Sequence, residues 1–132
     1  MIKKDKAAKG DGACSRSKCP VSCVLDLLGD KWTLLLVRDL LLGKSTYTEF
    51  QQSPEGIPTN ILAERLKRLQ VAGIIEKLPY QERPLRYRYQ LTDKGRDLYP
   101  VLSAMIDWGN RYVEGTISRT EIEALLAAKK YT

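Results

Sequence analysis

The residues best suited to covalent chemistry are three cysteines near the amino-terminal end. Cys19 directly precedes Pro20, which suits the first position of a helix, and Arg16 and Lys18 are close in sequence. A helix N-terminus and neighbouring cations both favour the thiolate, which is the reactive form of cysteine. Cys19 is therefore a candidate redox- or electrophile-sensing thiol. The alternative is that a small apolar residue suits this position and the thiol is incidental.

The other two cysteines are given different roles. Cys23 follows Cys19 by one helical turn and is expected to pack in the interior, whereas Cys14 is expected to be a bystander or a resolving thiol. An odd number of cysteines does not suggest a secreted disulfide framework, so all three are expected to begin as thiols in a reducing compartment. Three thiolates could bind a soft metal ion, but their spacing matches no zinc motif, and no metal site is predicted.

Several classes of enzyme are excluded by composition. The sequence has no histidine, which removes Ser-His and Cys-His nucleophiles and zinc sites that use imidazole. It also has no phosphate-binding glycine loop and no paired carboxylates in a motif typical of a cleft. We expect a protein that is not an enzyme and needs no cofactor.

The charge balance favours an anionic partner. Lys and Arg number 22 against 16 Asp and Glu, and the isoelectric point is near 9.3. Arg38 and Asp39 interrupt the longest apolar run, which is too short to span a membrane, and the first residues lack the apolar core of a signal peptide. A cytoplasmic location without membrane contact is therefore expected.

The elements that position these residues follow from helical periodicity and from glycine and proline breaks. A flexible basic arm is expected over residues 1–18, then helices over 20–28, 31–42, about 48–52 and 58–72. The third begins at an expected capping box, Thr48 with Gln51, and a tight turn at 53–56 precedes the fourth. Residues 74–78 and 85–91 alternate as strands around a tip at 81–84. This ribbon is expected to set its apolar side chains on the helices and its arginines opposite.

Two helices beyond the ribbon complete the chain. Thr92 and Asp93 cap the first, which is expected to kink at Pro100, and Ser118 with Glu121 forms a capping box for the second. Their apolar stripes have no evident partner within the chain, which predicts a symmetric homodimer; a larger monomeric helical core is the alternative. The expected fold is mainly α with a small β-ribbon, a winged helix-turn-helix with terminal dimerisation helices. Its parts are the arm 1–18, the winged domain with its kinked helix 19–112, and the last helix 113–132.

Several sequence runs closely resemble HxlR-type regulators, which are distant relatives of the MarR group. They are CPV at 19–21, LDLLGDKWTLLLVRDL at 25–40, YTEF at 47–50, IPTNIL at 57–62, RLKRL at 65–69, AGII at 72–75 and YQLTDKG at 89–95. The resemblance covers roughly residues 19–108 and implies a dimeric winged-helix repressor or activator of transcription. It also implies that the cysteine at position 19 responds to quinones, aldehydes or oxidants.

Helix 58–72 is expected to enter the major groove of a pseudo-palindromic operator, with half-sites about 34 Å apart. Thr59, Asn60 and Lys67 are predicted near base edges. The face opposite an inner leucine stripe is expected to carry Asn60, Glu64, Lys67 and Arg68.

Three alternatives stay open: an ordinary solvated face, a winged-helix protein-interaction module without specific DNA binding, and a small apolar ligand between subunits. Two groups of arginines are assigned to other contacts: Arg65 and Arg68 to phosphates or Glu64, and Arg83, Arg86 and Arg88 to the DNA backbone or a minor groove.

Overall fold

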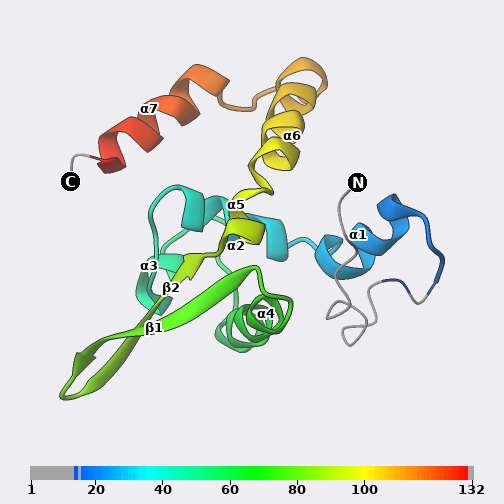
Figure 1. The fold of residues 1–132 in the computed structure, drawn as a ribbon. Coiled ribbons are helices and arrows are strands. Elements are labelled where there is room, and N and C mark those ends of the chain that lie inside the picture. The colour runs from blue at the N-terminus through cyan, green and yellow to red at the C-terminus, as the bar shows by residue number, and fades with distance from the viewer. Residues whose placement is uncertain (1–13, 15, 131–132) are drawn as a thin grey trace.

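The computed structural model describes residues 14 and 16–130, and for 126–130 only the backbone (Figure 1). Most of the arm expected over residues 1–18 lies outside this range. In the described part of the chain, no helix combines the length and apolar character needed to cross a bilayer. The elements, in order, are α1 (Pro20–Leu28), α2 (Thr33–Leu41), α3 (Tyr47–Gln51), α4 (Thr59–Val71), β1 (Ile75–Glu82), β2 (Leu85–Leu91), α5 (Asp93–Arg96), α6 (Tyr99–Tyr112) and α7 (Arg119–Lys130).

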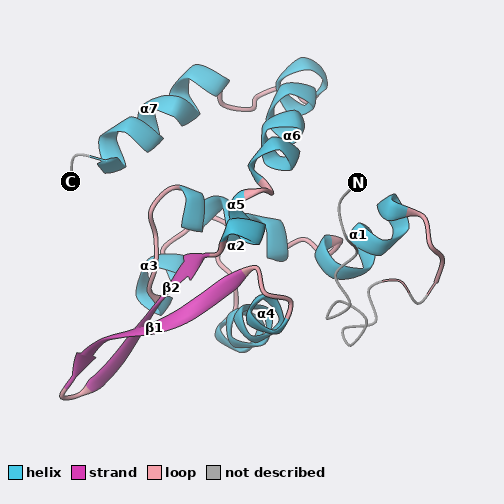
Figure 2. Ribbon diagram, in the orientation of Figure 1, coloured by secondary structure: helices cyan, strands magenta, loops and turns pink. Residues whose placement is uncertain are grey.

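The core forms where α2, α3 and α4 meet the base of the β1–β2 ribbon (Figure 2). Phe50 of α3 is fully buried, and α4 contributes the leucine stripe expected from its sequence, Leu62, Leu66 and Leu69. The ribbon is antiparallel, and the backbone N–H of Tyr89 donates to the Ser45 carbonyl, which ties β2 to the loop before α3. Gly73 has a φ of 77°, a value that favours glycine, where the chain turns from α4 into β1. Helix α4 and the ribbon thus share one hydrophobic core.

Two expected helix boundaries are wrong. The capping residue of α3 is Thr46 rather than Thr48: its hydroxyl accepts from the Glu49 N–H, while the Glu49 carboxylate accepts from the Thr46 N–H. The break expected at Pro100 falls earlier, because α5 ends at Arg96 and Pro100 lies in the first turn of α6. Proline fits a first turn, where its missing N–H would have no helical partner. The capping box of Ser118 with Glu121 is confirmed, as is the Thr92 cap.

The ribbon departs from the expected two-faced arrangement. Only the base of β2 packs on the helices, through Tyr89 and Leu91, whereas Leu85 and Tyr87 are exposed. The outer half extends away from the body with no helix beneath it (Figure 1). Its alternation therefore distinguishes two faces, but only the half near the core buries one of them.

The helices at the two ends of the described chain carry exposed apolar surface. In α1, Leu28 is the one buried residue, while Val21, Val24 and Leu25 are exposed. No residue of α6 is fully buried. Arg119 fixes α7 to α6 by hydrogen bonds to the Ser103 carbonyl and to Asp107. The corner between α6 and α7 is thus well defined, although their outer faces are open to solvent.

Candidate nucleic-acid interface

Helix α4 presents a polar face next to the ribbon. Asn60 and Lys67 are exposed, and among the described residues neither side chain has an ion-pair or hydrogen-bond partner. Ala63 lies between them on the same face and is also exposed, so no large side chain blocks this stripe. Thr59 is exposed as well, but its hydroxyl accepts a hydrogen bond of 3.0 Å from Gln51 of α3. Gln51, which was expected only in a capping box, and Ala63 were not predicted at this face.

Both arginines of α4 are engaged within the protein. Arg65 Nε donates to Asp30 Oδ2 at 2.9 Å, and Arg68 Nη2 donates to Asp30 Oδ1 at 2.8 Å. Arg65 also pairs with Glu64, as one of the expected alternatives had it. The expectation that Arg68 points away from the body is wrong: it is half-buried, and it also donates to the Thr33 hydroxyl. These arginines hold α4 against the start of α2.

Asp30 is the centre of this cluster. Its Oδ2 also accepts from the backbone N–H of Trp32 at 2.9 Å, and the Thr33 hydroxyl donates to its Oδ1. Partial burial by itself raises the pKa of the Asp30 carboxyl, but the hydrogen bonds from Thr33 and Arg65 outweigh it and hold that pKa well below its usual range. Asp30 therefore caps α2 and bridges it to α4 in its ionised form.

This cluster predicts an acid-sensitive contribution to stability. Because the pKa of Asp30 is lower in the folded state, its contribution is fully present above the unfolded value near 3.9 and is lost as pH falls below it. Asp30→Asn is expected to reduce the free energy of unfolding at pH 7 by about 1.5–3 kcal/mol, the range for hydrogen bonds to charged groups. Urea unfolding from pH 7 to pH 3 measures this. A difference between the two proteins that stays constant over that range would contradict it.

A second polar cluster fixes the turn between α3 and α4. Arg38 of α2 makes two hydrogen bonds to the Glu55 carboxylate, at 2.8 and 2.9 Å. Asp39 is buried and accepts from the Ser53 hydroxyl at 2.6 Å, and Lys44 in turn donates to that hydroxyl. The hydrogen bond from Arg38 lowers the pKa of Glu55. The sequence indicated this turn only by its breakers, and its charged partners were missed.

The ribbon arginines lie on the outer half of the ribbon, which extends away from the body (Figure 1). Arg83, Arg86 and Arg88 are exposed and belong to no ion pair among the described residues. Arg86 and Arg88 project from the same side of β2, opposite Gln81 and Leu78 of β1. Together with Lys67 they give positive charge to two neighbouring elements. Such an arrangement is chemically suited to a polyanion.

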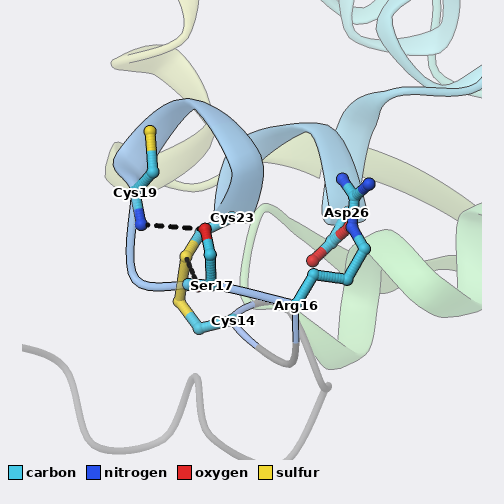
Figure 3. The surroundings of a disulfide bond; sticks show 6 residues. All are labelled: Cys14, Arg16, Ser17, Cys19, Cys23 and Asp26. Carbon is cyan, nitrogen blue, oxygen red and sulfur yellow. Dashed lines mark hydrogen bonds and ion pairs between the residues drawn. A yellow bond between two sulfur atoms is a disulfide. The ribbon is translucent and has the colours of Figure 1, made fainter.

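The cysteine region differs from the expectation. Cys14 and Cys23 are joined in a disulfide, with Cα atoms 4.6 Å apart, so Cys23 is neither a free thiol nor buried packing (Figure 3). The hypothesis of three thiolates around a soft metal does not fit this state. Cys19 is free and exposed at the N-cap of α1, where the N–H groups of Ser22 and Val21 lower the pKa of its thiol.

Comparison with known proteins gives a consistent result. Residues 27–117 match the model of the HxlR-like helix-turn-helix family. The HTH-type transcriptional regulator YdeP of Bacillus subtilis is 36% identical over 112 residues, covering 85% of this chain and 83% of that protein. The redox regulator HypR in its oxidised form is 32% identical with a TM-score of 0.66, covering 73% of this chain and 99% of that one. The reduced form of the B. subtilis transcriptional regulator YodB is 32% identical with a TM-score of 0.62, covering 75% and 98%.

Proposed function

Since the chain belongs to the HxlR-like helix-turn-helix family and is a transcriptional regulator of HTH type, we propose that it binds duplex DNA sequence-specifically as a homodimer. Helix α4 enters the major groove, and the β1–β2 ribbon follows the neighbouring backbone. The winged helix-turn-helix fold supports this assignment. In this fold the second helix of the helix-turn-helix motif reads the bases, and here that helix is α4.

The exposed, unpaired face of α4 is the observation that carries the proposal. Asn60 is suited to bidentate pairing with adenine, and Lys67 to the acceptors of guanine. Thr59 lies at the first turn and contributes either to a base edge or, with Gln51, to a phosphate. Arg83, Arg86 and Arg88 contact phosphates or a minor groove. Arg65 and Arg68 act mainly through Asp30, by fixing the angle at which α4 is presented.

Dimerisation is proposed from the unpartnered apolar surfaces. Val101, Met105, Trp108 and Tyr112 are all exposed and fall within about 60° of one another around α6. An open apolar cavity of about 820 Å³ lies between α2, α6 and α7. A second copy would bury such surface from water, which favours a two-fold dimer. Two α4 helices would then meet half-sites about 34 Å apart on a pseudo-palindrome.

Fluorescence anisotropy tests the proposal directly. The purified protein is titrated with duplex from its own upstream region and with random duplex, at several salt concentrations. We expect a preference for the upstream duplex of about a thousandfold or more at physiological salt, with steep salt dependence. Equal affinity for both duplexes, or binding that ignores salt, would contradict specific DNA recognition and favour a protein-interaction module.

Cys19 is proposed as the site at which a small electrophile or oxidant alters regulation. Its exposure and lowered pKa support this role, as does the similarity to a protein named as a redox regulator. Cys19→Ser is expected to bind operator normally but to keep its affinity after quinone treatment, whereas wild type loses binding. Anisotropy before and after one equivalent of quinone measures the difference.

The matched control retains Cys19 and removes the other two cysteines. The double variant Cys14→Ser, Cys23→Ser is expected to respond to quinone as wild type does, because alkylation needs one thiolate only. A Cys19→Ser protein that still loses DNA affinity with quinone would rule out this thiol as the sensor.

A further inference from the structure

The disulfide and an ion pair hold the chain before α1 against the helix itself. Cys14 is bonded to Cys23 of α1, and Arg16 pairs with Asp26 of α1 at 2.6 Å. Within this loop the Ser17 hydroxyl accepts from the Cys19 N–H at 3.2 Å. Cys19 thus sits at the N-cap inside a covalently closed loop, with both other cysteines of the chain in the bond that closes it.

The free sulfur of Cys19 is separate from this bond. Figure 3 shows the Cys19 side chain directed away from the disulfide, on the other side of the start of α1. With the pair closed, no other cysteine of the same chain retains a thiol that could react with Cys19. The state of the Cys14–Cys23 pair therefore determines which partners an oxidised Cys19 has.

We propose that Cys14 and Cys23 form a second redox site, a reversible disulfide that decides what becomes of Cys19 after oxidation. This inference rests on the proposed thiol chemistry of Cys19 and not on DNA binding. A low-molecular-weight disulfide such as glutathione disulfide closes the pair: the two cysteines lose two electrons and two protons, and two glutathione thiols are released. A dithiol reopens the pair by the reverse exchange.

The pair selects between two fates of the same intermediate. A hydroperoxide transfers one oxygen to the Cys19 thiolate, which yields the sulfenic acid, and the peroxide leaves as an alcohol or water. With the pair closed, the sulfenic acid persists until an external thiol or nucleophile meets it. With Cys14 free, its thiol condenses with the sulfenic acid, which forms a Cys14–Cys19 disulfide and releases water. A closed pair thus keeps Cys19 open to external reagents, and an open pair returns it to an internal disulfide.

Trapping of the sulfenic acid distinguishes these fates. Full-length protein is equilibrated with glutathione and a small proportion of glutathione disulfide, which keeps a lone thiol such as Cys19 reduced while a paired dithiol can close. It is then freed of small thiols and treated with one equivalent of hydrogen peroxide in the presence of dimedone. Wild type is expected to show one alkylatable thiol per chain before peroxide and a dimedone adduct at Cys19 after it. Cys23→Ser leaves Cys14 free, and its adduct is expected to fall by about tenfold or more, since a neighbouring thiol acts at high effective concentration.

The double variant Cys14→Ser, Cys23→Ser is the matched control, because it removes the internal partner and should restore the adduct to the wild-type amount. Three alkylatable thiols in the equilibrated wild type, a Cys19-containing disulfide in its peptides, or equal adducts in wild type and Cys23→Ser would each overturn the proposal. Since labelling requires no DNA, these outcomes are independent of whether the operator proposal holds.

Discussion

Replacing Trp108 with glutamate is expected to give a folded monomer that no longer holds the operator. Trp108 is 63% exposed in the single chain and lies 5.2 Å, between ring centroids, from Tyr112. It is the largest side chain of the exposed α6 stripe, and aromatic residues at interface centres contribute about 2–4 kcal/mol. A buried carboxylate would oppose association further. The dimer dissociation constant should therefore rise by a factor of about 100 or more, as sedimentation equilibrium measures.

Loss of DNA affinity follows from loss of the dimer. In the dimer the second α4 binds its half-site from a high effective concentration, whereas a monomer binds each half-site separately. Trp108→Phe keeps the aromatic contact and is expected to remain dimeric, which controls for the substitution itself. Circular dichroism checks that the core, to which Trp108 does not belong, is intact. A Trp108→Glu protein that stays dimeric would exclude this stripe as the interface.

Most helices could be predicted from sequence because their ends are marked by local chemistry. Gly29, Gly43 and Gly73 each follow a helix by one or two residues, and Pro58 precedes α4. The errors arise where two local signals compete. Thr46 and Thr48 both precede an acceptor by three residues, but the Glu49 carboxylate also accepts from the Ser45 N–H at 2.7 Å, which favours the earlier cap.

The polar face of α4 was harder to predict. Periodicity separates buried from exposed positions, and it correctly left Asn60 and Lys67 facing solvent. It does not indicate that Arg65 and Arg68 meet Asp30, since that carboxylate precedes them by 35 and 38 residues in sequence. Helical periodicity alone therefore overstated the charge that α4 offers to a partner.

The predictions for the ribbon and for the cysteines were wrong for related reasons. Alternation in β2 predicts two faces, but which residues are covered depends on how far the ribbon extends beyond α4. Tyr87 instead contacts Lys77, whose ammonium lies 4.2 Å from the centroid of the Tyr87 ring. Pairing of Cys14 with Cys23 requires the preceding chain to fold back along α1, which no periodicity reports.

The different roles proposed for α4 and the ribbon predict different effects of removing one positive charge. Lys67→Ala is expected to reduce operator affinity by about 1–3 kcal/mol while changing affinity for random duplex much less, because a base-edge contact exists only at the correct sequence. The specificity ratio should fall by about fivefold to 150-fold. Competition anisotropy against single-base operator variants identifies the base pair at which preference is lost.

Arg86→Ala is expected to weaken operator and random duplex alike. Each phosphate contact releases about 0.9 counterion from B-DNA, so the slope of log affinity against log salt should become shallower by about one for both duplexes. The specificity ratio should change little. Titrations from 50 to 200 mM salt, a range of about a factor of four over which such contacts have large effects, supply the slope.

Arg111→Ala is the matched control for net charge. Arg111 is exposed on α6, where its guanidinium lies 5.9 Å from the Tyr112 ring. Helix α6 extends away from α4 and from the ribbon (Figure 1). If the slope depends on specific phosphate contacts, removing this charge should leave the slope unchanged. Salt largely screens charges that are more than about 10 Å apart. Equal changes in slope for Arg86→Ala and Arg111→Ala would mean that Arg86 acts only through the net charge of the protein and contacts no specific phosphate. Equal losses of specificity for Lys67→Ala and Arg86→Ala would refute the separate roles of α4 and the ribbon.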